Sequence, residues 1–141
     1  MSNEAPDVPD FSGTWKLVPK ESKLPGMPVK QMIVQITHKD PDFAQVSKVE
    51  YIDGRTAVRT FMGRTDGEKF ANASADVMVV SVAKWVGKEL LIETTIDPKS
   101  GEAPLRDYWS LTDGGRKLRM EHRDDALNGF VGVLERMQDG K

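Results

Sequence analysis

Two histidines are the side chains in this 141-residue sequence best suited to acid–base chemistry. His122 lies within EHRDD (121–125), where a carboxylate of Asp124 or Asp125 could orient its imidazole as a general acid and base. That pair would suit an isomerase or cyclase acting on a bound substrate. The alternative is a solvated turn, because runs of charged residues usually occur in turns. His122 is the one catalytic candidate that the sequence offers.

Other reactive groups are few. The chain has no cysteine, and two histidines cannot complete the four nitrogen or sulfur ligands of a structural zinc site. It contains neither a Gly-x-Ser-x-Gly elbow nor a glycine-rich phosphate loop. One axial histidine is enough to bind haem iron, so a haem-binding barrel is an alternative. For both His38 and His122, the other interpretation is a bond to a loop at the barrel end. We predict no metal site and no cofactor.

The net charge and the hydropathy of the sequence limit the classes of partner that the protein could bind. A net charge of -2 gives no field that attracts polyanions, so we predict no nucleic-acid partner. The longest apolar stretch, Val77 to Val82, is far shorter than the roughly 20 residues that cross a bilayer, so we predict no membrane span. The N-terminal residues MSNEAPDVPD do not resemble a secretory signal. We expect a cytoplasmic protein, with a mature secreted form whose signal has been removed as the alternative.

Alternation of apolar and polar residues indicates strands throughout. In DFSGTWKL (10–17), Phe11, Gly13, Trp15 and Leu17 share one face of an extended strand. Further strands are expected near residues 32–38, 43–52, 55–62, 68–73, 77–85, 89–96, 105–111, 118–123 and 129–137, joined mostly by short turns. Residues 19–30 contain three prolines and allow one helical turn at most.

The fold class is therefore all-β: a single antiparallel up-and-down β-barrel of nine or ten strands with little helix. We expect residues 1–9 to form a disordered tail, residues 10–138 the barrel domain, and residues 139–141 a C-terminal tail. The side chains expected to line the interior and contact a ligand are Met32, Val34, Ile36, Tyr51, Val58, Ile92, Trp109, Met120, His122, Phe130 and Leu134.

Three segments carry a resemblance to a known family. PDFSGTWKL (9–17), VAKWVGKELLIE (82–93) and the pair LTDGG (111–115) with VLERM (133–137) resemble strands of the calycin superfamily. Within it, the chain is most similar to the lipocalin-like intracellular lipid-binding proteins, the fatty-acid and retinoid carriers. The resemblance implies a ten-strand barrel around a cavity for one small apolar molecule. It also implies that Trp15 closes the barrel bottom, with Arg136 lying over its ring.

Two features depart from that family. The family has a helix-turn-helix lid between its first two strands, where this chain has the proline-rich residues 19–30. The family also binds a ligand carboxylate through two arginines and a tyrosine. Aligning ERM (135–137) with the family's last strand places Gly132, Leu134 and Trp109 at those anchoring positions. The resemblance therefore implies a ligand that is neutral or held by other groups.

The predicted function is non-covalent binding of a small hydrophobic molecule inside the barrel. Three alternatives stand beside it: an isomerase or cyclase that uses His122, a haem-binding barrel, and a barrel filled by its own side chains that acts as an interaction module. The sequence carries no signal for an oligomeric state.

Overall fold

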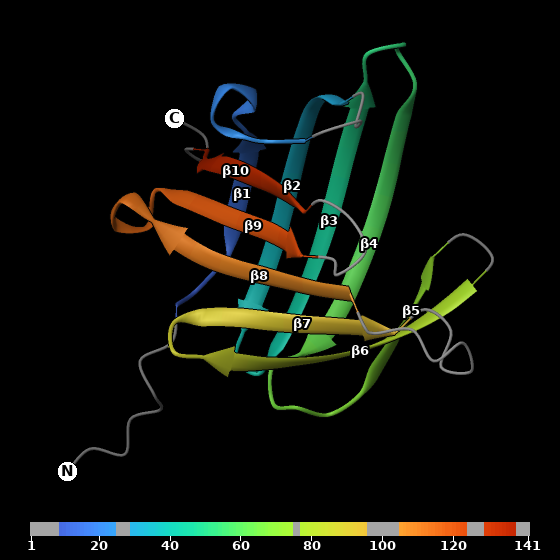
Figure 1. Ribbon diagram of the computed structural model, residues 1–141, viewed down its shortest axis with the longest axis vertical. Coiled ribbons are helices and arrows are strands. Elements are labelled where there is room, and N and C mark those ends of the chain that lie inside the picture. Colours follow the sequence, from blue (N-terminus) through green and yellow to red (C-terminus); the bar gives the residue numbers. More distant parts are fainter. Residues whose placement is uncertain (1–8, 25–28, 75–76, 96–104, 124–128, 138–141) are drawn as a thin grey trace.

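A computed structural model of the protein describes residues 9–24, 29–74, 77–95, 105–123 and 129–137 (Figure 1). Ten strands account for most of them, and the two helices, η1 (Pro19–Glu21) and η2 (Asp113–Gly115), have three residues each. The strands are β1 (Gly13–Leu17), β2 (Val29–Lys39), β3 (Asp42–Tyr51), β4 (Thr56–Arg64), β5 (Phe70–Ser74), β6 (Val77–Val86), β7 (Glu89–Thr95), β8 (Leu105–Thr112), β9 (Lys117–Arg123) and β10 (Phe130–Arg136). No helix in these ranges is long and apolar enough to cross a bilayer.

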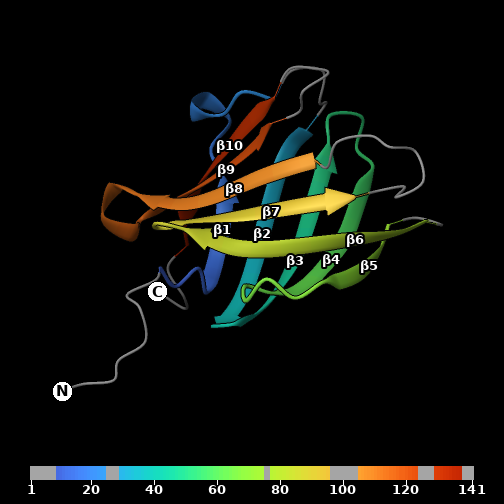
Figure 2. The ribbon, with the colours of Figure 1, turned by 60° about the horizontal axis from the view of Figure 1, so that its bottom comes forward.

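The strands form one antiparallel sheet in the order β4-β3-β2-β1-β10-β9-β8-β7-β6-β5. Strands that follow one another in sequence pair with each other, except β4 and β5, and β1 pairs with β10, so the chain winds around almost a full barrel. The long strands β2, β3 and β4 form one layer, and β6, β7 and β8 cross it as a second layer (Figure 2). The predicted fold class, an all-β up-and-down barrel, is confirmed. Of the two tails expected at residues 1–9 and 139–141, residues 1–8 and 139–141 lie outside the described residues.

The barrel is packed around Trp15 at one end. Trp15 is fully buried, its indole Nε1–H donates to the carbonyl of Phe11 at 2.9 Å, and the guanidinium carbon of Arg136 lies 4.2 Å from its ring centroid. Gly13 makes this arrangement possible, because its φ is +137° and a Cβ there would lie 2.6 Å from Nη1 of Arg136. The contact that the resemblance implied between Trp15 and Arg136 is therefore present.

An aromatic cluster continues from this end into the barrel. Ring pairs with centroids 5.6–6.0 Å apart connect its seven members, Phe11, His38, Phe43, Phe61, Phe70, Trp85 and Trp109. Aromatic pairs at such distances add stability beyond the area they bury. The cluster therefore fills this half of the interior with the protein's own side chains.

His38 joins the cluster to the β2–β3 turn. Its Nδ1 accepts the Phe11 backbone N–H at 3.1 Å, so its Nε2 carries the proton that bonds to Oδ1 of Asp40 at 3.1 Å. The same Asp40 oxygen accepts bonds from Thr65 Oγ1 at 2.8 Å and Trp85 Nε1 at 3.2 Å. Partial burial raises the pKa of Asp40, but these three hydrogen bonds outweigh burial and lower it. His38 thus has a structural role at the barrel end.

The sheet is interrupted between β4 and β5, where no backbone ladder joins the two strands. We call this junction the seam. The Asn72 side chain crosses it, accepting from the Met62 N–H at 3.0 Å and donating to the Met62 carbonyl at 3.0 Å. Beside it, the Phe70 ring lies against Gly63, where a Cβ would come within 2.5 Å of the ring. Two side chains therefore close a gap that hydrogen-bonded strands close elsewhere.

Candidate functional site

Inward-facing side chains become less buried along the strands that lead away from Trp15. On β10, Leu134 is fully buried whereas Phe130 is half-buried, and on β9 Leu118 is fully buried whereas Met120 and His122 are half-buried. The same change separates Val34 from Met32 on β2 and Trp109 from Asp107 on β8. We call the less buried part of the inner wall the open half; its residues are Met32, Tyr51, Thr94, Leu105, Asp107, Met120, His122 and Phe130.

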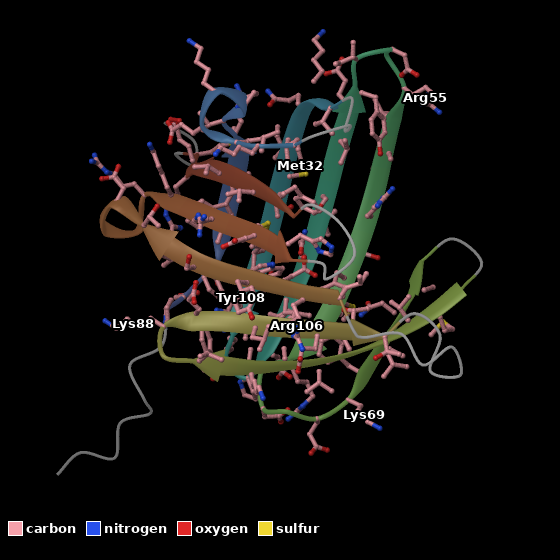
Figure 3. The ribbon with its side chains drawn as sticks, in the orientation of Figure 1. Met32, Arg55, Lys69, Lys88, Arg106 and Tyr108 are labelled. Atoms are coloured by element: carbon pink, nitrogen blue, oxygen red, sulfur yellow. The ribbon has the colours of Figure 1, made fainter. Side chains whose placement is uncertain are left out.

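The two ends can be located from their turns. Arg55 marks the β3–β4 turn, at the end of β3 that carries Tyr51, and Lys88 marks the β6–β7 turn at the other end, beside Trp85 (Figure 3). Met32 lies on β2 toward the Arg55 end of that strand, consistent with its place in the open half (Figure 3). The candidate site is therefore at one end of the barrel, opposite the packed end around Trp15.

The structure places the sequence-predicted interior residues in three groups. Met32, Tyr51, Met120, His122 and Phe130 belong to the open half. Val34, Ile36, Ile92, Trp109 and Leu134 also face inward, but they are buried in the packed core. Val58 lies on the outer face, because it pairs with the exposed Lys48 and its side chain is 63% exposed. The expectation that Val58 lines the interior is wrong, since the inward register of β4 passes through Ala57, Arg59 and Phe61 instead.

Asp107 and His122 form a hydrogen-bonded pair of ionisable side chains inside the open half. They are direct partners in the β8–β9 register, and Nδ1 of His122 lies 2.8 Å from Oδ1 of Asp107. The imidazole also stacks on Phe130, with centroids 4.8 Å apart and planes 11° from parallel. The sequence predicts Asp124 or Asp125 as the carboxylate that orients His122, and both of these residues lie outside the described residues. The partner that the structure identifies is Asp107.

Sequence reasoning missed Asp107, although a signal for it exists. In LRDYW (105–109), strict alternation puts Leu105, Asp107 and Trp109 on one face, so the carboxylate interrupts an otherwise apolar inner face. The neighbouring Arg106 faces outward and bonds Glu93 at 3.2 Å. An acidic residue at an inward position of a barrel strand is costly unless it is paired. Such an interruption is therefore a useful pointer to a site.

Burial raises the pKa of Asp107, and the hydrogen bond and charge of His122 reduce this shift without cancelling it. The Asp107 side chain is nevertheless 32% exposed and that of His122 15%. The carboxyl group is thus partly desolvated, and part of its surface remains accessible. The pair can accept or donate a hydrogen bond according to where its protons are.

Other polar side chains on the inner wall bond to one another. Ser81 and Thr94 join their hydroxyl oxygens at 2.8 Å, and Gln45 Nε2 donates to Ser47 Oγ at 2.7 Å. Among the described residues, no buried side-chain nitrogen or oxygen lacks a hydrogen-bond partner, and no three His, Cys, Asp or Glu side chains gather as a metal site would require.

We expect the Asp107→Asn variant to have a free energy of unfolding at pH 7 equal to or greater than that of the parent protein. The folded state raises the pKa of Asp107, so the protonated carboxyl is better tolerated in the fold than the carboxylate. The contribution of Asp107 to the free energy of unfolding is therefore largest below its ordinary pKa of about 4, and it falls as pH rises through the raised pKa of the folded state. The variant should therefore gain relative stability between pH 4 and pH 7. Urea unfolding at a series of pH values measures this.

Asp42→Asn is the control for that experiment, because Asp42 is an exposed carboxyl with 72% of its side chain accessible. Removing its charge should change stability little, and the change should not follow the same pH course. A large loss of stability in Asp107→Asn at pH 7, absent at pH 4, would show that Asp107 stabilises the fold as a carboxylate.

No protein-family model matches the sequence, and no curated protein matches it. Solved structures do match. A fatty-acid-binding protein 1 of Echinococcus granulosus is 15% identical with a TM-score of 0.65, covering 91% of this chain and 98% of that one. A Schistosoma mansoni fatty-acid-binding protein in complex with arachidonic acid is 18% identical with a TM-score of 0.64, covering 91% and 96%. Caenorhabditis elegans lipid binding protein 8 is 11% identical with a TM-score of 0.68, covering 90% and 95%.

At these identities the likeness concerns the fold alone. It extends over nearly the full length of both chains in each case. The resemblance of the sequence to the calycin superfamily is thus matched in three dimensions, and the chain has the nearly closed ten-strand barrel fold of the fatty-acid-binding proteins.

Proposed function

We propose that the protein binds a small apolar molecule non-covalently in the open half of its barrel. The observation that carries the proposal is the change in burial along the inner wall. Side chains around Trp15 are completely buried, whereas Met32, Met120 and Phe130 face inward and remain accessible. Burying accessible apolar surface of this kind contributes roughly 25 cal/mol per Å² to binding.

The fold supports the same proposal. The Schistosoma protein of similar fold is described in complex with arachidonic acid, an apolar chain with a carboxylate head. In this chain the positions that the family alignment assigns to carboxylate anchors hold Gly132, Leu134 and Trp109, which have no cationic group. The apolar wall is therefore retained while the anchor differs, and we infer a ligand whose head is not a carboxylate.

Titration with a neutral environment-sensitive dye, N-phenyl-1-naphthylamine, tests the proposal. The dye should gain fluorescence on binding with micromolar affinity. Met32→Trp, which adds bulk to the open half, should weaken dye binding at least tenfold, or about 1.4 kcal/mol. Val58→Trp adds the same side chain to the outer face and should leave dye affinity unchanged.

Circular dichroism confirms in each case that the variant is folded. Equal dye affinity in both variants would place the dye outside the barrel. If neither the dye nor a broad panel of apolar molecules binds at high protein concentration, the barrel is filled by its own side chains and acts as an interaction module instead.

A second function, proton transfer on the bound molecule, is favoured by one observation: Nδ1 of His122 lies 2.8 Å from Oδ1 of Asp107. An imidazole oriented by a carboxylate is the arrangement used in general acid–base catalysis. If the protein turns over a candidate substrate, and His122→Gln abolishes turnover but leaves affinity and stability intact, the protein is an isomerase or cyclase rather than a binding protein.

A further inference from the structure

The Asp107–His122 pair is the polar centre of an otherwise mostly apolar wall. On the strands beside it, Ile92 is the β7 partner of Asp107 and Phe130 is the β10 partner of His122. Both of these side chains are hydrophobic and face inward. A ligand that enters the open half would therefore cover the pair with apolar surface, and its own polar group would have to replace the water that the pair loses.

Among the side chains that the structure describes, the charged groups near the pair do not favour an anionic head. Arg106 and Arg119 are close in the strand register, but Arg106 bonds Glu93 at 3.2 Å and Arg119 bonds Glu121 at 2.9 Å on the outer face. Arg59, the inward cation of β4, stands opposite Ser47 on a strand that pairs with neither β8 nor β9, the strands of Asp107 and His122. A carboxylate placed beside Asp107 would add a like charge in a poorly solvated space, which is strongly unfavourable.

The hydrogen-bonding groups of Asp107 and His122 further limit which ligand head groups could bind there. Asp107 has a second oxygen, Oδ2, besides the Oδ1 that contacts His122, and Nε2 of His122 has no hydrogen-bond partner among the described residues. A carboxylate oxygen covered by a ligand needs a donor, or its desolvation is uncompensated. An ester offers acceptors only. A hydroxyl can donate to Asp107 and also accept from His122 when Nε2 is protonated.

We propose that Asp107 and His122 bind the hydroxyl head of an apolar alcohol, with Phe130 holding the imidazole in place from one side. This assignment rests on the proposed function, because it names the chemical class of the molecule bound in the open half. An amine head could also donate to Asp107. An ammonium head loses far more hydration than a hydroxyl when it enters the apolar half, so a hydroxyl fits better.

Displacement of the neutral dye by four matched ligands tests this inference at pH 7, where the acid is ionised: decan-1-ol, decanoic acid, methyl decanoate and decylamine. We expect the alcohol to bind at least tenfold more tightly than the acid and the ester. Two substitutions of Asp107 then separate hydrogen bonding from charge. Asp107→Leu, which removes both, should abolish the preference for alcohol over ester, and ester affinity should rise because the ester no longer covers a carboxylate oxygen that lacks a donor.

Asp107→Asn, which keeps an acceptor without the charge, should retain alcohol binding and improve the affinity of the acid. Asp42→Asn removes an exposed outer charge and should leave all four affinities as in the parent protein. Three results would each overturn the hydroxyl assignment while leaving the proposed function intact. The first is that the acid binds as tightly as the alcohol, and the second is that the amine binds tenfold more tightly than the alcohol. The third is that the preference for alcohol over ester survives in Asp107→Leu. Failure of the dye and all four ligands to bind would overturn both.

Discussion

Replacing Trp15 with alanine is expected to lower the free energy of unfolding by about 3–5 kcal/mol, as truncation of a fully buried aromatic side chain does. The indole bonds the Phe11 carbonyl and carries the Arg136 guanidinium on its ring face, so the variant loses a hydrogen bond and a cation–π contact besides creating a cavity. Equilibrium unfolding in urea, followed by circular dichroism, measures the loss.

Arg136→Ala provides the partner measurement. Arg136 also donates from Nη1 to the Ser12 carbonyl at 2.7 Å, so this variant should be destabilised, though less than Trp15→Ala. Trp15 and Arg136 touch, so the double variant should lose less than the sum of the two single losses. A change of less than about 1 kcal/mol in Trp15→Ala would contradict the packed-end interpretation.

The second large effect is expected at the seam. Gly63→Ala should destabilise the protein by about 1–3 kcal/mol, because a Cβ there would lie 2.5 Å from the Phe70 ring and 2.9 Å from the Phe43 ring. Both rings belong to the aromatic cluster and cannot move without disturbing their neighbours. Thermal and urea unfolding of the variant measure the loss.

Gly132→Ala is the matched control for Gly63→Ala, since both glycines are inward-facing and neither has a positive φ. A Cβ at Gly132 meets its nearest neighbours at 3.8–4.0 Å, which is ordinary contact. We expect this variant to be unchanged or more stable by up to about 1 kcal/mol. Equal losses in the two variants would mean that β-strand glycines here are needed for a reason other than the space beside them.

The strands were predictable because their apolar residues alternate and their turns carry Gly and Asp. The hairpin at Asp53-Gly54, for example, separates β3 and β4 as expected. The inward face of β4 was not predictable from its sequence, TAVRTFMGR. Arg59 stands at an inward position while Val58 and Met62 point outward, so hydrophobicity alone selects the wrong side. The register of a neighbouring strand is needed to decide it.

The candidate site was predictable in part. His122 can be identified from its residue type and its inward position. The adjacent sequence suggests Asp124 or Asp125 as its partner, whereas the structure pairs it with Asp107 on the neighbouring strand. A pairing between residues 15 positions apart depends on strand register, which a single sequence does not specify. The inner wall divides into a packed half and an open half according to the combined sizes of all the inward side chains, and these depend on the same strand register.

The seam bears on the width of the barrel. When every strand is hydrogen-bonded to two neighbours, strand number and stagger set the diameter, and a change of girth requires many backbone bonds to break. Between β4 and β5 the circumference is completed by one amide, Asn72, and one ring, Phe70, and just beyond β4 by one backbone bridge, in which the Gly67 N–H donates to the Ala83 carbonyl at 3.0 Å. Widening the barrel between β4 and β5 would cost the two hydrogen bonds of the Asn72 side chain and the edge-to-face contacts of the Phe70 ring with Phe43 and Phe61. At this junction the circumference of the barrel is thus set mainly by side-chain contacts rather than by a continuous ladder of backbone hydrogen bonds.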